Sequence, residues 1–419
     1  MTNSIRALLL AAPAFASSWA FVAQAQTVPA GSSSSSSGAS SSADWSIKPR
    51  GRLQLDYGNV TGPALDLPVN QVELGPDTRV RRAYLGVDVT IPGNWGARFE
   101  VDFAAKPVTL VDAYVFYKPR NDITITAGHH KPFWGMEELG SDNFTSFQER
   151  SSFSTAFGFE RRLGVSASYV GKSVIVQGGV FTDDLTALGF PDSGTAVPRD
   201  FDDAWSFDAR AVYMPKIGAN GKGGRLHFGG SVHYRETKGL ETVRYRARPF
   251  VRTTDLRFVD TGNITGTGGE LGIGLEGAYV QGPFHASVES FWQKALRPGQ
   301  FSPTFNGGYA ELGYVLTREA TPYKNGAYDR LTPKRPVGKG GIGAFQLNAR
   351  YDWLNLNDGA FVGGRQDMAG VSLVWAPIAQ LRFIADYGHF WVHDSPVTAA
   401  GGRGDYQADA FGLRGQIDF

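Results

Sequence analysis

The chain contains no cysteine, and after its first residues it contains no long apolar run. Without cysteine, no disulfide can constrain its folding or its export. A transmembrane helix needs about 20 consecutive apolar residues, and no segment beyond the N-terminal stretch provides them. An excess of one charge is also lacking, because 41 Lys and Arg residues oppose 40 Asp and Glu residues. Any preference for charged solutes must therefore come from where the charges sit and not from the net charge.

The chain is rich in glycines and aromatic residues, although its composition as a whole is polar. It contains 53 Gly, 13 % of its residues are aromatic, and only 42 % are hydrophobic. This combination is typical of strands that alternate along their length, with one face for lipid and the other for water. The composition therefore favours a membrane-spanning β-structure over a set of soluble domains.

Residues 1–25 have the pattern of a secretory signal peptide. Arg6 supplies the positive charge, residues 7–23 are mostly apolar, and Ala23-Gln24-Ala25 is a small-residue cleavage site. An N-terminal anchor helix is the alternative, which the cleavage site and the polar run after it disfavour. Residues 26–44 are predicted to be a Ser-rich flexible linker in the periplasm, without chemistry. Residues 45–419 are predicted to form a single domain.

Within this domain, short segments alternate apolar and polar residues. Four segments show it best, with apolar faces of Ala97, Phe99, Val101 and Phe103, of Trp205, Phe207, Ala209, Ala211 and Tyr213, of Phe345, Leu347, Ala349, Tyr351 and Trp353, and of Leu381, Phe383, Ala385 and Tyr387. The opposite faces carry Arg98, Glu100, Asp102, Asp208, Arg210, Gln346, Asn348, Arg350, Asp352, Arg382 and Asp386. A packed core would not tolerate these charges unpaired, so we expect acids and arginines to pair along or across strands.

The repetition of this pattern predicts an all-β fold, a transmembrane antiparallel β-barrel. One such strand could belong to a soluble sandwich, but a soluble protein of this size would bury some strands on both faces. About 16 or 17 segments alternate, and bacterial single-chain barrels have even strand numbers, so we expect about 16 strands. A barrel of that size leaves an aqueous channel.

The last strand is the clearest local signal. Phe411, Leu413, Ile417 and Phe419 share one face of the segment that begins at Tyr406, and the chain stops on the last of them. An amphipathic final strand ending in Phe resembles the assembly signal of outer-membrane barrels. We expect Phe419 to anchor closure of the barrel against the first strand, around residues 52–57.

Several motifs, in this order, resemble the phosphate-selective porin O and P family. They are TRVRRAYLGVDV (78–89), VDAYVFYKP (111–119), GHHKPFWGMEELGSDNFTSFQER (128–150), ERRLG (160–164), YRARP (245–249), GGYAELGYVLTREATPY (307–323) and ARYDWLNLND (349–358). The resemblance covers nearly the whole mature chain. It implies a homotrimer of barrels with about 16 strands, an inward-folded loop that narrows each pore, and lumenal Arg and Lys that pass anions.

The resemblance places the constriction loop at Gly128–Gly164, which is far longer than a turn needs. The candidate cations of the anion pathway in and near this loop are Lys131, Arg150, Arg161, Arg162 and Arg82. Arg82 shares its face with Tyr84 and Asp88, and is preferred for this reason over Arg81 as a pore-lining residue. His129-His130 does not predict a metal site, because adjacent strand residues point to opposite sides.

A second set of candidate cations is Arg244, Arg246, Arg248 and Arg252. At a period of two residues, the arginines project to one side and Tyr245 to the other. A row of guanidinium groups, each a fork that matches phosphate oxygens, makes a stepped path for oxyanions. The alternatives are a solvated external loop or contacts to lipopolysaccharide phosphates. The family's row is longer, and Phe250 interrupts this one.

No motif predicts an enzyme, a cofactor or a metal site. GIGLEG at 272–277 matches a dinucleotide fingerprint but lies in an alternating strand without a following helix. We expect a cell outer membrane porin, exported through the periplasm, for passive diffusion of small anions such as phosphate. The alternatives are a general or differently selective porin and a non-conducting structural or adhesive barrel. The expected partners are the lipid bilayer, lipopolysaccharide and the barrel assembly machinery, and no nucleic acid.

Overall fold

The computed structural model describes residues 45–66, 74–105, 108–182, 204–218 and 223–419. The predicted signal peptide and linker lie outside these residues. In the described ranges, no helix is both long enough and apolar enough to cross a membrane.

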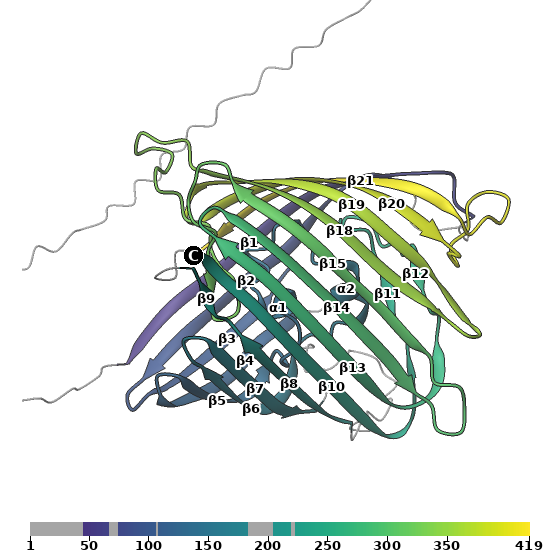
Figure 1. Ribbon diagram of the computed structural model, residues 1–419, viewed down its shortest axis with the longest axis horizontal. Coiled ribbons are helices and arrows are strands. Elements are labelled where there is room, and N and C mark those ends of the chain that lie inside the picture. The colour runs from purple at the N-terminus through teal and green to yellow at the C-terminus, as the bar shows by residue number, and fades with distance from the viewer. Residues whose placement is uncertain (1–44, 67–73, 106–107, 183–203, 219–222) are drawn as a thin grey trace, which may run out of the picture. The chain divides into compact units, whose positions relative to one another are not determined.

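Nearly all of the regular structure is β-strand (Figure 1). The long strands are β1 (Ser46–Thr61), β2 (Gly75–Ile91), β3 (Trp95–Asp102), β4 (Thr109–Arg120), β5 (Ile123–His130), β6 (Arg162–Val170), β7 (Val174–Phe181), β8 (Trp205–Tyr213), β10 (Gly224–Val243), β13 (Ile264–Gln281), β14 (Phe284–Leu296), β15 (Thr304–Val315), β18 (Ala344–Asp358), β19 (Phe361–Ile378), β20 (Leu381–His393) and β21 (Tyr406–Asp418). The short elements are β9 (Lys216–Ile217), β11 (Arg246–Ala247), β12 (Val259–Asp260), β16 (Tyr323–Lys324), β17 (Ala327–Tyr328), α1 (Met136–Leu139) and α2 (Ser152–Phe157).

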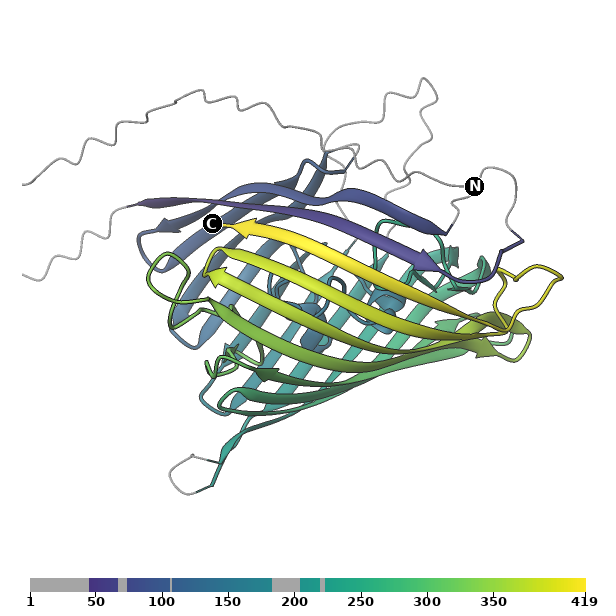
Figure 2. The ribbon, with the colours of Figure 1, turned by 90° about the horizontal axis from the view of Figure 1, so that it is seen from above.

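The long strands form a closed antiparallel barrel. Each pairs with its neighbours in chain order, and β1 also pairs with β21, from Arg52 opposite Asp418 to Thr61 opposite Asp409. Figure 2 shows β1, in purple, beside β21, in yellow. The short β9 only extends the sheet beside β10, so the wall has 16 strands. The predicted fold class and strand number are confirmed.

The alternation of faces is also confirmed. In β18, Leu347 and Tyr351 are 48 % and 45 % exposed, whereas Asn348 and Asp352 are each 1 % exposed. A barrel wall explains this inverted pattern, since the apolar residues face lipid and the polar residues face the interior. Val101 is buried although it lies opposite Leu85, an exposed residue on the outer face of β2.

Among the connections that the structure describes in full, three fold into the interior of the barrel. Residues 131–161, between β5 and β6, carry α1 and α2, which Figures 1 and 2 show inside the ring of strands. Residues 244–263 connect β10 to β13 and carry β11 and β12. Both connections lie at the end of the barrel opposite to the start of β1 and the end of β21, whereas residues 316–343, which carry β16 and β17, lie at the same end as these two. The expected inward loop is present, and the third connection was not foreseen.

Candidate functional site

The inward loop, residues 131–161, is tied to the inner wall by hydrogen bonds. Its backbone N–H groups donate to Asp352 (from Ser152), Asp386 (from Gln148) and Glu289 (from Met136), each at 2.7 Å. Its carbonyl groups accept from Arg382 and Arg414. These contacts give hydrogen-bond partners to polar groups that are buried inside the barrel. Without partners, such groups would lower the stability of the fold. They fix the loop across the interior.

Acids and arginines do pair across neighbouring strands, but Arg98 and Arg350 pair with acids outside the four segments named from the sequence. Arg350 pairs with Glu311 of β15 and Glu137 of the inward loop, each at 2.8 Å. Arg98 pairs with Asp88 at 2.7 Å, and Glu100 pairs with Arg50 at 2.8 Å. Strand alternation fixes which face a charge occupies, but the choice of partner depends on register and on the inward loop.

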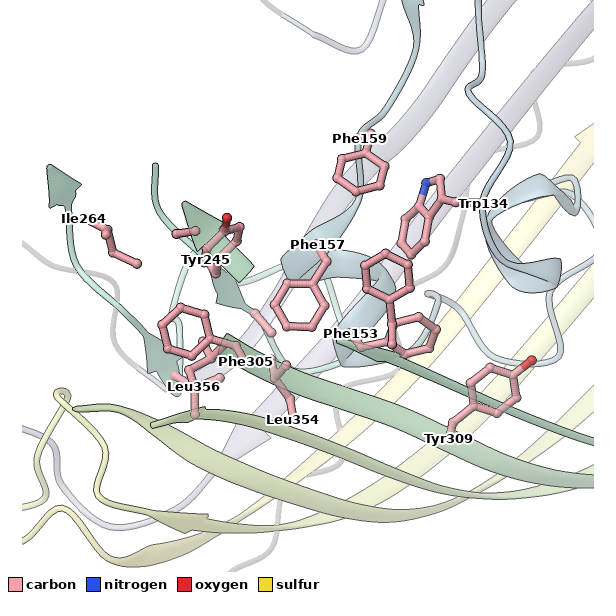
Figure 3. Close-up of a cluster of buried hydrophobic side chains, with 14 residues drawn as sticks. Trp134, Phe153, Phe157, Phe159, Tyr245, Ile264, Phe305, Tyr309, Leu354 and Leu356 are labelled. Carbon is pink, nitrogen blue, oxygen red and sulfur yellow. The ribbon is translucent and has the colours of Figure 1, made fainter. Parts of the chain in front are cut away.

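One side of the interior is filled by aromatic and aliphatic side chains (Figure 3). This filled side lies against β13, β14, β15 and β18. The inward loop contributes Trp134, Phe153 and Phe157, and the ring centroid of Trp134 lies 4.9 Å from that of Phe291 on β14. Tyr245, from residues 244–263, packs on Phe157 with ring centroids 5.6 Å apart. No water-filled path passes through so dense a cluster.

The other side of the interior, against β1 to β7, is open. A cavity of about 500 Å³ lies there between the wall, the inward loop and Asn325 of the third connection. Its cationic lining consists of Arg50, Arg52, Arg98, Lys118, Lys131 and Arg161, and its acidic lining of Glu100, Asp112 and Asp142. Six cations against three acids give this cavity a positive balance that the whole chain lacks.

Arg82 lies where the sequence placed it, on the inner face of β2. Its Nε is 2.9 Å from Asp142 of the inward loop, and the same carboxylate accepts from Arg52 at 2.8 Å. Burial alone would raise the pKa of Asp142, but Arg82 and Arg52 hold that pKa well below its usual range. Two arginines on one ionised acid leave a net positive charge at this point.

Arg81 also faces the interior, which the parity argument did not foresee. The pairing of β1 with β2 shifts register here, so that Gln54 faces Arg82 and Leu55 faces Val80. The additional residue, Arg81, pairs with Glu149 of the inward loop at 2.6 Å. A β-bulge aims two successive side chains to one side, so simple alternation fails at this position.

Two of the predicted loop cations hold the inward loop together. Arg150 donates to the carbonyl groups of Glu137, at 3.0 Å, and Gly140, at 2.9 Å. Lys131 lines the cavity and lies 3.0 Å from Glu138. Burial and the nearby charge of Arg150 lower the pKa of Lys131 to about 8, although Glu138 opposes this shift.

The other two predicted loop cations lie where the inward loop returns to the wall. Arg161 lines the cavity and donates to Asp112 at 2.7 Å. Arg162 begins β6 opposite His130. His130 is bonded to Ser166 and to the backbone of Gly128. Among the described residues, no group of three or more His, Cys, Asp or Glu could hold a metal ion.

The arginines of residues 244–252 project to the side opposite Tyr245 and Ala247, which are buried. Arg244 pairs with Asp260 at 2.7 Å, and Arg252 lies 3.4 Å from Glu149. Arg248 pairs with Asp255, and Arg246 is exposed. Phe250 does interrupt the row, as the sequence indicated. Its ring packs on Phe390 of β20 and on Phe147 of the inward loop, so this segment crosses the mouth of the barrel.

Sequence reasoning missed two further arginines at this mouth. Arg79 of β2 lies 3.4 Å from Asp255, and Arg257 follows in the same segment. Burial and the nearby charges of Arg248 and Arg246 lower the pKa of Arg257 to about 9. This crowding of like charges is the signature of a positive cluster. Alternation counted from Arg82 would place Arg79 on the outer face, so the bulge at Arg81 hid this residue from the sequence analysis.

Comparison with known proteins identifies relatives of this chain. The family model of the phosphate-selective porin O and P matches residues 47–419. An uncharacterized protein of Caulobacter vibrioides is 39 % identical over 90 % of this chain and 75 % of its own length. Porin O of Pseudomonas aeruginosa is 24 % identical over 75 % of this chain and 74 % of its own. The anion-selective porin from Comamonas acidovorans is similar in structure, with a TM-score of 0.52 and 13 % identity over 90 % of this chain and 100 % of that one.

Proposed function

The chain belongs to the phosphate-selective porin O and P family, and on this premise we propose that it passes small anions, phosphate among them, through the open side of its barrel. Membership of this family and the closed barrel of 16 strands assign it to the outer-membrane porins. Diffusion is passive, down the concentration gradient. The contacts described next support the proposed preference for anions.

The observation that carries the proposal is a continuous series of ionic contacts from the mouth to the cavity. Arg252 at the mouth lies against Glu149, which also pairs with Arg81. Arg82 reaches the same carboxylate at 3.9 Å and continues to Asp142, which lines the cavity. Burial opposes ionisation, but Arg81, Arg82 and Arg252 hold the pKa of Glu149 well below its usual range. Cations outnumber acids along this route, so it attracts anions.

The chemistry of these side chains suits phosphate. A guanidinium group is always charged near neutral pH and offers paired N–H donors to oxyanions. Acids beside the arginines weaken each site, and several weak sites in series allow an ion to leave as well as to enter. Arg246, exposed at the mouth, is placed to meet an incoming anion first.

A differently selective porin is the second candidate, and one observation favours it. Pro249, Phe250 and Val251 are buried within the mouth, so the arginine row ends after Arg248, and Arg252 stands apart from it. A shorter row discriminates less between phosphate and other anions. A non-conducting barrel has no comparable support.

Single-channel recording in planar bilayers under a salt gradient tests the proposal. We expect an anion-selective reversal potential and a chloride current that added phosphate reduces. Replacing Arg246, Arg248 and Arg252 with Ala should shift the potential toward that of a neutral pore. The matched control is Arg365→Ala, because Arg365 is exposed and pairs with Asp367 on the outer wall. A cation-selective wild-type pore, or a triple variant with unchanged selectivity, contradicts the proposal.

We further propose that the barrel is a homotrimer in contact with lipopolysaccharide, inserted by the barrel assembly machinery through Phe419. The backbone of Phe419 exchanges two hydrogen bonds of 3.1 Å with Gly51 of β1, next to the seam with β21. Its ring lies against Gly51, where a side chain on that residue would collide with it. Phe419→Ala should lower the amount of assembled barrel in membranes, and the mobility of unheated protein in gels should report a trimer. A monomeric mobility excludes the trimer.

A further inference from the structure

The inner wall of the open cavity changes its chemistry from strand to strand. On β1 and β3 it presents the guanidinium groups of Arg50 and Arg98, and on β4 it presents the ring of Phe116. On β5, β6 and β7 it presents neutral polar groups, those of Thr124, Ser168 and Gln177. One cavity therefore offers cations and an aromatic face on β1, β3 and β4, and hydroxyl and amide groups on the neighbouring strands β5, β6 and β7.

The neutral wall is an ordered row. Thr124 lies opposite Ser168 in the pairing of β5 with β6, and Ser168 lies opposite Gln177 in the pairing of β6 with β7. Gln177 donates to the hydroxyl of Ser168 at 3.2 Å. In the ranges that the structure covers, the Thr124 hydroxyl has no protein hydrogen-bond partner, so it is free to bind a solute. Hydroxyl and amide groups both donate and accept hydrogen bonds, which suits a solute that does the same.

The charged wall has a cation placed beside the aromatic face. The Lys118 amine lies 5.3 Å from the ring centroid of Phe116, two residues earlier on the same strand. Lys118 is exposed to the cavity, and no acidic partner of this amine lies in the described part of the chain. Arg50 and Arg98, in contrast, are both paired with Asp88. Lys118 is thus the cation best able to receive an anionic group.

We propose that this cavity selects organic anions that carry several hydroxyl groups, the chemistry of sugar phosphates and sugar acids. The anionic group binds at Lys118, the carbon frame lies on Phe116, and the hydroxyl groups bond to Thr124, Ser168 and Gln177. The cavity volume of about 500 Å³ is in the range of small-molecule sites, roughly 300–1,000 Å³, and far exceeds the needs of inorganic phosphate. The inference rests on the proposed function and names a solute class for the same pore.

Current interruptions in single channels test this assignment, with glucose 6-phosphate as the probe. Inorganic phosphate, glucose and hexanoate are the comparison solutes, since each lacks either the hydroxyl groups or the charge. A few added hydrogen bonds should lengthen the dwell time of glucose 6-phosphate about tenfold over that of inorganic phosphate. Equal dwell times for glucose 6-phosphate and inorganic phosphate overturn the assignment. The reversal potential in chloride, measured in the same bilayers, reports separately on the proposed anion preference.

Two variants locate the effect. The double variant Thr124→Val and Ser168→Ala removes the hydroxyl wall with little change of volume, and Thr61→Val, at the far end of β1, is its matched control. The double variant should lose the tenfold difference and keep its chloride conductance and reversal potential, whereas T61V should keep all three. A double variant that still holds glucose 6-phosphate as long as the wild type does contradicts the assignment.

Discussion

The two sides of the interior are built from the same kind of strand but have different contents. On the filled side, inward-facing residues such as Phe291 and Leu354 pack against the aromatic residues of the inward loop. On the open side, inward-facing residues such as Arg50 and Arg98 line a cavity. The alternation of inward and outward side chains is the same in both. The difference shows that a barrel of this size becomes a selective pore through what the connections place inside it.

Small residues in the wall decide on which side the inward loop packs. A side chain at Gly307 of β15 would collide with Phe153 of the inward loop, and one at Gly272 of β13 would collide with the ring of Phe291. Glycine at these two positions makes room for the aromatic cluster. Apolar burial then holds the aromatic part of the loop against β13, β14, β15 and β18, and the cavity remains on the side of β1 to β7.

The largest expected effect is a loss of stability when Trp134, the central side chain of the aromatic cluster, is truncated. Trp134→Ala removes a ring that is 1 % exposed and contacts Phe153, Phe159 and Phe291. Truncating a buried Trp costs about 3–5 kcal/mol, so unfolding in urea, followed by heat-dependent gel mobility, should occur at much lower denaturant. The conservative Trp134→Phe should cost far less. If the two sides are independent, the anion selectivity of the Trp134→Ala pore stays unchanged, and altered selectivity would disprove that independence.

The second effect concerns selectivity on the open side. Arg81→Ala removes one charge from the series of contacts between mouth and cavity. A unit charge about 4 Å from a passing ion is worth about 1 kcal/mol in water, so the ratio of anion to cation permeability should fall by up to about fivefold. Glu149 keeps Arg414 as a partner at 2.9 Å, and stability should change little. Arg81→Lys retains the charge and should retain the selectivity. An Arg81→Ala pore as selective as the wild type would place the anion path elsewhere.

A smaller change in anion selectivity should appear when the pH is raised. Lys131, with its pKa lowered to about 8 by burial, is charged below pH 8 and neutral above it. Anion selectivity should therefore decline between about pH 7 and pH 9, and one of six cavity cations accounts for the step. Lys131→Met should remove the step near pH 8 and leave the decline near pH 9 that belongs to Arg257, whose pKa is lowered to about 9. A step of the same size in Lys131→Met would assign the titration to another group.

The sequence predicted the wall of this barrel far better than its interior. The faces of the strands follow from a period of two residues, and the closing strand β21 was recognised from its apolar face ending in Phe419. The inward position of Arg81 could not be predicted, because a bulge cannot be inferred from alternation alone. The packing of Trp134 on Phe291 and the entry of residues 316–343 depend on contacts between segments far apart in the chain. Such contacts leave no periodic signal.

The smallest expected effect probes the third connection, which reaches both sides of the interior. Asn325 lines the open cavity, while the hydroxyl of Tyr323 bonds to His227 of β10. Tyr323→Phe removes that hydrogen bond and should cost about 1 kcal/mol. Amide exchange of residues 322–330 should become faster, since local opening depends on such tethers.

Selectivity in the Tyr323→Phe pore should remain that of the wild type, because no charge of the open side has changed. Single-channel current should show more frequent brief transitions, as a less firmly held segment moves at the edge of the cavity. Leu331, buried with Val315, Ala344 and Ala376, still anchors the segment to the wall, so large openings are not expected. A lasting increase in conductance would instead identify residues 316–343 as the main obstruction, and the contrast between filled and open sides would then depend on the third connection as much as on the inward loop.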